Sequence, residues 1–208
     1  MRLFEEAGVH VLGFGGHARS VADVALAAGL SDMIFIDAQA RPGELFAGFR
    51  TLTVLPAPRA VGWRIFPAMG DNLARKAALG QHDDLPLKLI SPTATLGVLA
   101  EVGLGTFVGH HAHVGPAAVV GRGVIVNTGA MVEHECQVGD FSHISVNATV
   151  AGRARIGSNV FVGAGATVID RISICDDVVV GAGATVVEDI VAPGTYVGTP
   201  ARLLNRSV

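Results

Sequence analysis

The chain has 208 residues, enough for one or two domains with a buried core that needs no disulfide or metal staple. Half of the residues are hydrophobic, yet only 5% are aromatic and 27 are glycine, which predicts an interior of small and β-branched side chains. The formal charge of -3, without any basic run, excludes a nucleic-acid-binding surface. The mean hydropathy of +0.50 arises without 18 consecutive apolar residues, so we expect no membrane span.

The start of the chain lacks the apolar stretch of a signal peptide, because acidic residues stand there instead. The two cysteines, Cys136 and Cys175, are too few and too far apart in sequence to suggest a disulfide framework. We therefore expect a cytoplasmic protein.

Residues 1–85 predict a small α/β domain of the Rossmann-like βαβ type. A short apolar strand over residues 9–12 leads through a glycine-rich turn into a helix over 18–28, and a second strand follows at 33–36. A third strand is expected at 65–69, followed by a helix that begins at Asp71 or Asn72 and runs through Leu79.

The glycine-rich turn is a candidate phosphate-binding site. Gly13, Gly15 and Ala18 follow a strand, and Asp37 ends the next strand, which fits a loose form of the dinucleotide fingerprint. Glycines let the backbone approach a phosphate, and a helix N-terminus favours an anion. A tight turn without a ligand is the alternative. Because 85 residues supply too few strands for a full dinucleotide domain, a nucleotide or nucleotide sugar is preferred over NAD.

Residues 86–208 contain a hexad repeat. Stepping by six from Ile90 to Val186, every position is Ile, Leu or Val, usually followed by glycine, and the fourth position after it is usually small. Six residues at about 3.3 Å each make a flat face of roughly 20 Å. Three faces close a prism of 18 residues per turn, so we predict a parallel β-helix of five to six turns. After Val186 the phase slips and Val191 takes the inward position, which indicates a cap.

The glycine column is interrupted around a histidine between two glutamates, Glu133, His134 and Glu135. A histidine held by a carboxylate is suited to act as a general base at neutral pH, although an exposed His-Glu pair is also common on solvated corners. The sequence leaves open which glutamate reaches the imidazole. Gly152 follows His134 by one predicted turn, so its amide is a candidate oxyanion donor.

Taken together, these motifs resemble the nucleotide-amino-sugar acetyltransferases of the hexapeptide-repeat superfamily, including the bacillosamine and perosamine N-acetyltransferases and the sialic acid O-acetyltransferases. The resemblance covers essentially the whole chain. It is carried in order by the Gly13–His17 loop, Asp37, Gly70-Asp71-Asn72, Ile90–Ala94, Val126-Asn127-Thr128, Glu133–Cys136, Phe141-Ser142-His143 and Ala151-Gly152.

The resemblance implies a left-handed prism and a homotrimer with its sites between subunits. It implies acetyl transfer from acetyl-CoA to the 4-amino group of a nucleotide-linked deoxysugar, for surface glycan or glycoprotein synthesis, and no metal. His134 would be the base and Glu135 its partner. The cofactor would meet His143, Gly152, Ala164 and Ala182. The nucleotide sugar would meet Gly13, Gly15, Gly16, His17, Asp37, Gly70, Asp71 and Asn72.

Other functions stay open. O-acetylation of a sialic-acid-like sugar is the nearest alternative, and the nucleotide carrier is undetermined. The histidines His110, His111 and His113 raise a zinc hydratase like the γ-class carbonic anhydrases, but no pair of histidines has the five-residue spacing of that site. A non-catalytic trimeric scaffold is a further alternative, and it would not require the interruptions around His134.

Overall fold

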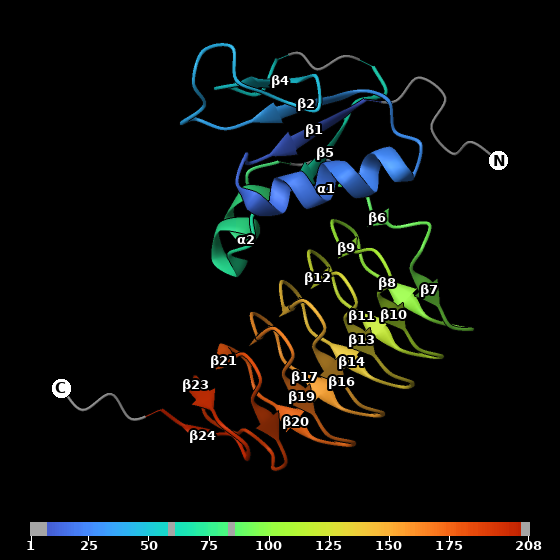
Figure 1. Cartoon of the computed structure of the whole chain (residues 1–208), viewed down its shortest axis with the longest axis vertical. Helices are drawn as coiled ribbons and strands as arrows, with labels where there is room; N and C mark the ends of the chain where they lie inside the picture. Colours follow the sequence, from blue (N-terminus) through green and yellow to red (C-terminus); the bar gives the residue numbers. More distant parts are fainter. Residues whose placement is uncertain (1–7, 58–60, 83–85, 205–208) are drawn as a thin grey trace.

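The computed structural model describes residues 8–57, 61–82 and 86–204. It shows an α/β layer stacked on a left-handed parallel β-helix, with both helices of the layer on the side of its sheet that faces the β-helix (Figure 1). Within these residues, no helix is long and apolar enough to cross a membrane.

The α/β layer is a twisted sheet with two helices. Its strands lie in the order β3 (Leu45–Phe46), β4 (Phe49–Leu52), β2 (Met33–Ile36), β1 (Val9–Leu12) and β5 (Arg64–Pro67), parallel except for the β3–β4 hairpin. Helix α1 spans Gly16–Ala27, and α2 spans Asn72–Gly80 with Asp71 as its N-cap. The strands and helices expected from the sequence are present within a few residues. The β3–β4 hairpin is absent from the prediction, because two-residue strands give no periodic signal.

The β-helix has three faces, which we name in chain order. Face A contains β6 (Leu89–Ile90), β9 (Phe107–Val108), β12 (Ile125–Val126), β15 (His143–Ile144), β18 (Phe161–Val162), β21 (Val178–Val180), β23 (Gly194–Val197) and β24 (Arg202–Leu203). Face B contains β7 (Thr95–Leu96), β10 (His113–Val114), β13 (Met131–Val132), β16 (Thr149–Val150), β19 (Thr167–Val168) and β22 (Thr185–Val186). Face C contains β8 (Glu101–Val102), β11 (Val119–Val120), β14 (Gln137–Val138), β17 (Arg155–Ile156) and β20 (Ser173–Ile174).

The strand register is the predicted one. Each strand pairs in parallel with the strand 18 residues on, as in Val114 with Val132 and Val126 with Ile144. The second residue of each pair points inward, so the hexad aliphatics and the small residues form one continuous core. Leu96, in the first coil, is an exception and stays 44% exposed. The expectation for Val191 is wrong, because Ile190 pairs with Ile174 and is buried, whereas Val191 is exposed.

The corners between faces need one residue per hexad in the left-handed region. Ten of these described residues are not glycine and have φ between 55° and 61°: Leu99, His111, Ala117, Glu135, Phe141, Asn147, Arg153, Asn159, Arg171 and Asp177. Each such residue costs on the order of 1 kcal/mol, which the stacked strands offset. We name the corners by the faces they join. His134 lies on corner BC, which is opposite face A across the triangular section.

The α/β layer packs on face A. Outward-facing Phe107 and Ile125 are buried in one cluster with residues of α1 and β1. Asn72 donates from Nδ2 to the Val160 carbonyl at 3.2 Å, which ties α2 to corner CA. The apolar cluster therefore runs across the expected boundary between residues 85 and 86. Residues 83–85 lie outside the described part, and the boundary stays a prediction.

Candidate active site

His134 and Glu135 form an ion pair on corner BC. His134 Nδ1 lies 3.1 Å from Glu135 Oε2, and both side chains are about half exposed. The left-handed backbone of Glu135 turns its carboxylate back toward the preceding residue. Glu133 is not the partner, so the choice left open by the sequence is decided in favour of Glu135.

The pairing fixes which imidazole nitrogen can accept a proton. Hydrogen bonds from His134 and from Arg153, whose Nε donates at 3.0 Å, lower the pKa of Glu135 and keep it ionised. An ionised carboxylate only accepts hydrogen bonds, so Nδ1 of His134 is the donor and Nε2 carries the lone pair. That orientation is the one a general base needs.

Gly152 supports the imidazole from the next coil. A Cβ at Gly152 would lie 2.5 Å from His134 Nε2, so only glycine leaves room for the ring. The main chain is tied at the same place, where Arg153 N donates to the His134 carbonyl at 2.9 Å. Cys136 is buried below, with Sγ 3.0 Å from the Ala151 carbonyl, and burial raises its pKa, which is consistent with a core residue.

A second group of residues lies under the α/β layer, and we call it the His143 cluster (His17, Gly70, Asn127 and His143). His143, on face A, is buried, with Nδ1 3.3 Å from the Gly70 carbonyl and Nε2 3.1 Å from Asn127 Nδ2. A carbonyl accepts and an amide NH₂ donates, so Nδ1 bears the proton. Burial, and then the charge of Arg75, lower the pKa of His143 to about 4. The ring is therefore neutral at pH 7.

His17 is the unsatisfied member of the His143 cluster. Its ring packs edge-on against Phe107 with centroids 4.9 Å apart, and Nε2 is buried without a hydrogen-bond partner among the described residues. Burial, and then His143, lower the pKa of His17 to about 3. A buried imidazole nitrogen without a partner is costly, so this atom is the place where a ligand hydroxyl or phosphate would be stabilising.

The glycine loop leaves its backbone open. Gly13 has a φ of 100°, and a Cβ at Gly15 or Gly16 would meet no heavy atom within 4 Å. Gly15 is the N-cap of α1 without a side-chain cap bond, and the first turn holds no acidic residue, which suits an anion. Asp37 accepts from Phe14 N and Gln39 N, both at 2.9 Å, and thereby holds the loop.

Two of the predicted substrate residues already have structural partners. The Asp71 carboxylate accepts from Ala74 N at 2.8 Å as the cap of α2. Asn72 is buried and bonds to Val160 and Arg75. Gly70, Asp71 and Asn72 also line a cavity of about 350 Å³ whose floor includes Phe161. This loop therefore shapes the space under α2.

Ala164 and Ala182 lie on corner AB, one coil apart, and both are exposed. Gly183 N donates to the Ala164 carbonyl at 2.9 Å, and a Cβ at Gly165 or Gly183 would meet no atom within 4 Å. The corner is thus a strip of small residues with open backbone, which fits a thin, extended ligand arm.

The predicted site residues therefore occupy three places in one chain. His134, Glu135 and Gly152 meet on corner BC, whereas His17, Gly70 and His143 meet at face A, and Ala164 and Ala182 line corner AB. Because corner BC is opposite face A, a single chain does not bring the candidate base to the candidate substrate loop. Arg75, buried beside Gly70 and His143, is absent from the sequence-based prediction, since an arginine in a short helix carries no recognisable signal.

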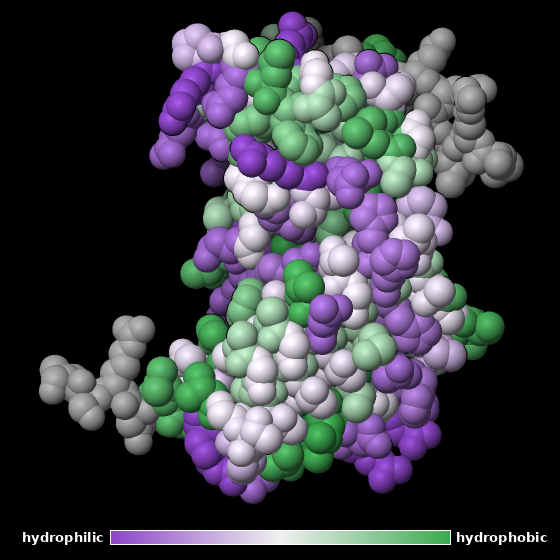
Figure 2. All heavy atoms as spheres, in the orientation of Figure 1, coloured by the Kyte–Doolittle hydropathy of each residue, from purple (hydrophilic) through white to green (hydrophobic). Residues whose placement is uncertain are grey.

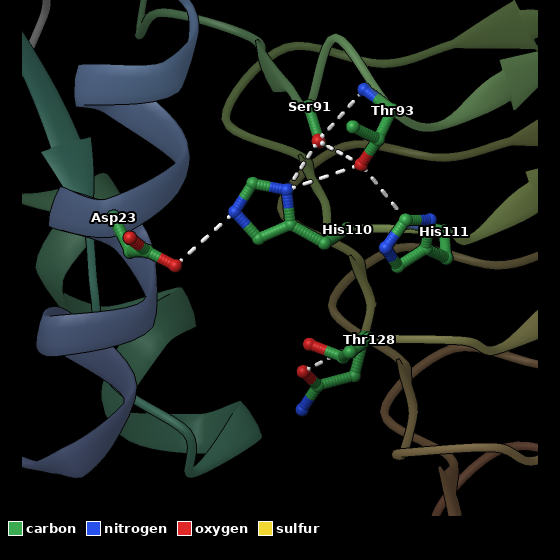
Figure 3. A network of polar contacts seen from close by, with 7 residues as sticks. Asp23, Ser91, Thr93, His110, His111 and Thr128 are labelled. Carbon is green, nitrogen blue, oxygen red and sulfur yellow. Dashed lines mark hydrogen bonds and ion pairs between the residues drawn. The ribbon is translucent and has the colours of Figure 1, made fainter.

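The histidines considered for a metal site have other partners. His110 bonds through Nδ1 to Ser91 Oγ at 2.7 Å, and through Nε2 to Asp23 on α1 at 3.2 Å (Figure 3). His113 Nδ1 lies 2.7 Å from Thr95 Oγ1. Within the described part of a single chain, no three His, Cys, Asp or Glu residues are grouped to hold a metal ion. The His110 network thus links α1 to corner AB.

The β-helix of hexads with an α/β layer on one face defines an acyltransferase of the hexapeptide-repeat class. Family models agree: the bacterial transferase hexapeptide model matches residues 153–188, and the PglD N-terminal domain model matches 9–81. No curated protein sequence matches the chain.

Solved structures identify the family. The acetyltransferase domain of PglB from Neisseria gonorrhoeae is 33% identical, with a TM-score of 0.90 over 96% of this chain and 100% of that one. Its complex with acetyl coenzyme A matches with a TM-score of 0.87 at 33% identity, over 95% and 98%. A histidine-to-asparagine variant of perosamine N-acetyltransferase from Caulobacter crescentus, with CoA and GDP-perosamine, is 30% identical, with a TM-score of 0.88 over 97% and 99%. The chain belongs to this family of hexapeptide-repeat acetyltransferases.

Proposed function

We propose that this protein transfers an acetyl group from acetyl-CoA to the 4-amino group of a nucleotide-linked deoxysugar, in the synthesis of a surface glycan or glycoprotein. The observation that carries the proposal is the His134–Glu135 pair, which leaves the Nε2 lone pair of His134 exposed above Gly152. The perosamine N-acetyltransferase relative supports an amine rather than a hydroxyl acceptor.

The residues divide the chemistry between them. Acetyl-CoA would supply an activated thioester carbonyl, and the strip at Ala164 and Ala182 fits its pantetheine arm. As the sugar nitrogen bonds to the carbonyl carbon, His134 Nε2 takes the proton from that nitrogen. Glu135 stabilises the imidazolium that results. When the carbon–sulfur bond breaks, the proton passes to the thiolate, and CoA leaves as the thiol.

The nucleotide sugar would bind at the α/β layer. The open amides of Gly15 and Gly16 are suited to the diphosphate, and the unpartnered Nε2 of His17 is suited to a hydroxyl or phosphate oxygen. Asp37 keeps the loop in shape, and Gly70 orients His143. Each of these groups is neutral or bonded, so the bound anion adds the charge that the loop lacks.

The separation of the candidate base from the candidate substrate loop supports a homotrimer with sites between subunits. In a cyclic trimer, corner BC of one subunit can face the His143 cluster of its neighbour. Exposed apolar side chains near corner BC are available for such contacts: Leu96, Val98, Leu99, Leu104, Val119 and Met131. Figure 2 shows the visible face of the β-helix as mostly pale, with hydrophilic residues along its right-hand edge.

The test is thiol release from acetyl-CoA with a panel of UDP-, GDP- and dTDP-linked 4-amino sugars and one sialic-acid-like hydroxyl acceptor. We expect turnover with a 4-amino sugar and a loss of about 1,000-fold in kcat for His134→Ala. Turnover that is undiminished in His134→Ala, or release with the hydroxyl acceptor alone, would refute the proposed reaction.

A further inference from the structure

Arg75 joins the α/β layer to the β-helix through one buried guanidinium. It is 1% exposed, and its five N–H groups reach acceptors in both layers. In the loop before α2 the acceptors are the carbonyls of Met69 (2.9 Å), Gly70 (3.2 Å) and Asp71 (3.2 Å), and the Asn72 Oδ1 atom (2.7 Å). On corner CA they are the carbonyls of Gly123 (2.6 Å), Phe141 (2.8 Å) and Ser142 (3.4 Å).

The charge of Arg75 has no carboxylate in contact, because every acceptor is a neutral oxygen. Burial lowers its pKa to about 10, so the guanidinium remains charged at neutral pH. A buried cation is a costly way to hold two layers together. Apolar packing of Phe107 and Ile125 already does this. What the rigid fork of an arginine adds is direction, since it fixes several carbonyls at once.

The directions fixed by Arg75 converge on His143. The Gly70 carbonyl that accepts from Arg75 Nη1 is the one that faces His143 Nδ1. On the other side, Nη2 bonds the carbonyls of the two residues that precede His143. The loop and the histidine are thus held by the same guanidinium from both ends.

We propose that Arg75 is a positioning residue for the acceptor substrate, which keeps the Gly70–Asn72 loop in register with His143 so that the two bind the nucleotide sugar as one unit. This inference rests on the proposed function. Arg75 itself touches no reacting atom. It is remote from corner BC, where His134 lies, so its loss acts on acceptor binding and leaves the base in place.

The kinetic test compares Arg75→Lys with Arg50→Lys, a matched change on the exposed strand β4. Lysine keeps the charge but loses the fork. We expect KM for the nucleotide sugar to rise about tenfold in Arg75→Lys, with kcat and KM for acetyl-CoA within about twofold of the parent. Arg50→Lys leaves all three constants unchanged. Unchanged constants in Arg75→Lys, or a parallel loss of activity with both substrates, would overturn the proposal.

A second readout needs no acetyl transfer. Nitrogen NMR of labelled histidines follows the tautomer and pKa of His143 in the parent chain and in Arg75→Met. Without the guanidinium, we expect the pKa of His143 to rise from about 4 and the Nδ1–H tautomer to lose its dominance. An unchanged His143 signal overturns the positioning role, even in an active enzyme. A parent chain that is inactive with every acceptor, yet shows this NMR response, refutes the proposed function and leaves the coupling intact.

If the Arg75 variants do not fold, Asn72→Ala replaces them. It removes one acceptor of the guanidinium and the bond to Val160, and it leaves the other contacts of Arg75 in place. We expect the same selective rise in KM for the nucleotide sugar, smaller in size. A folded Asn72→Ala protein that loses affinity for both substrates equally would contradict the proposal.

Discussion

The molecule contains two histidine sites with opposite surroundings. On corner BC, His134 is half exposed and paired with an ionised carboxylate. At face A, His143 and His17 are buried, uncharged and close to the cation Arg75. An exposed imidazole paired with a carboxylate is suited to take up and release a proton, whereas a buried neutral one is suited to hold a fixed hydrogen bond. One residue type therefore serves proton transfer in one place and recognition in the other.

The sharpest way to break the exposed site is to displace its imidazole without touching it. In Gly152→Ala the new Cβ would lie 2.5 Å from His134 Nε2, and the exposed ring can swing away. We expect kcat to fall about 100-fold with a nearly unchanged Tm, because a misplaced base costs rate and not folding. Steady-state kinetics and thermal unfolding measure both.

Gly80→Ala is the matched control for this change, since a Cβ there meets no heavy atom within 4 Å. It should keep the parent kcat. A Gly152→Ala enzyme with the parent kcat would show that the imidazole position above Gly152 is irrelevant to the reaction.

The two sites can also be separated genetically. If each active site uses His134 of one subunit and His17 of the next, His134→Ala and His17→Asn chains are each nearly inactive alone. After they are unfolded and refolded together, random mixing gives about one quarter of the sites both intact residues, and activity recovers to that level. The thiol-release assay on mixed trimers measures it. Mixtures no more active than their parents would place both histidines in the same subunit's site.

The buried site should make the fold sensitive to acid. The pKa values of His143 and His17, about 4 and about 3, lie below the ordinary value of 6.5. Between these values the unfolded chain binds more protons than the folded one. The stability from keeping the rings neutral is therefore complete above about pH 6.5. It is lost as the pH falls toward 4, and each histidine accounts for up to about 1.4 kcal/mol per pH unit.

Variants isolate this contribution from that of the carboxylates. Tm measured from pH 7 to pH 4 should fall less in His143→Asn than in the parent. His134→Asn, at the exposed site, should follow the parent curve. A parent-like slope in His143→Asn would show that His143 does not titrate on unfolding.

The two sites also differ in how far the sequence reveals them. His134, Glu135 and Gly152 follow from the hexad register, because residues one coil apart are stacked by the repeat itself. The His143 cluster joins residues 73 positions apart, Gly70 and His143, through the packing of a layer on face A. No periodicity encodes that packing, so the sequence does not reveal the buried Arg75. The prediction for His143 rests on family resemblance alone.

The smallest effect is expected at the other link between the layers. Asp23 on α1 reaches His110 at 3.2 Å, and its side chain is 73% exposed (Figure 3). An exposed pair of this kind contributes less than about 1 kcal/mol, so Asp23→Ala should lower Tm by no more than a few degrees. KM for the nucleotide sugar should stay within twofold of the parent, because Gly70 and His143 keep their contacts through Arg75. Thermal unfolding and steady-state kinetics provide the comparison. A loss in Asp23→Ala as large as that in Arg75→Lys would mean that any loosening of the two layers impairs acceptor binding, and that burial of the guanidinium gives Arg75 no special role.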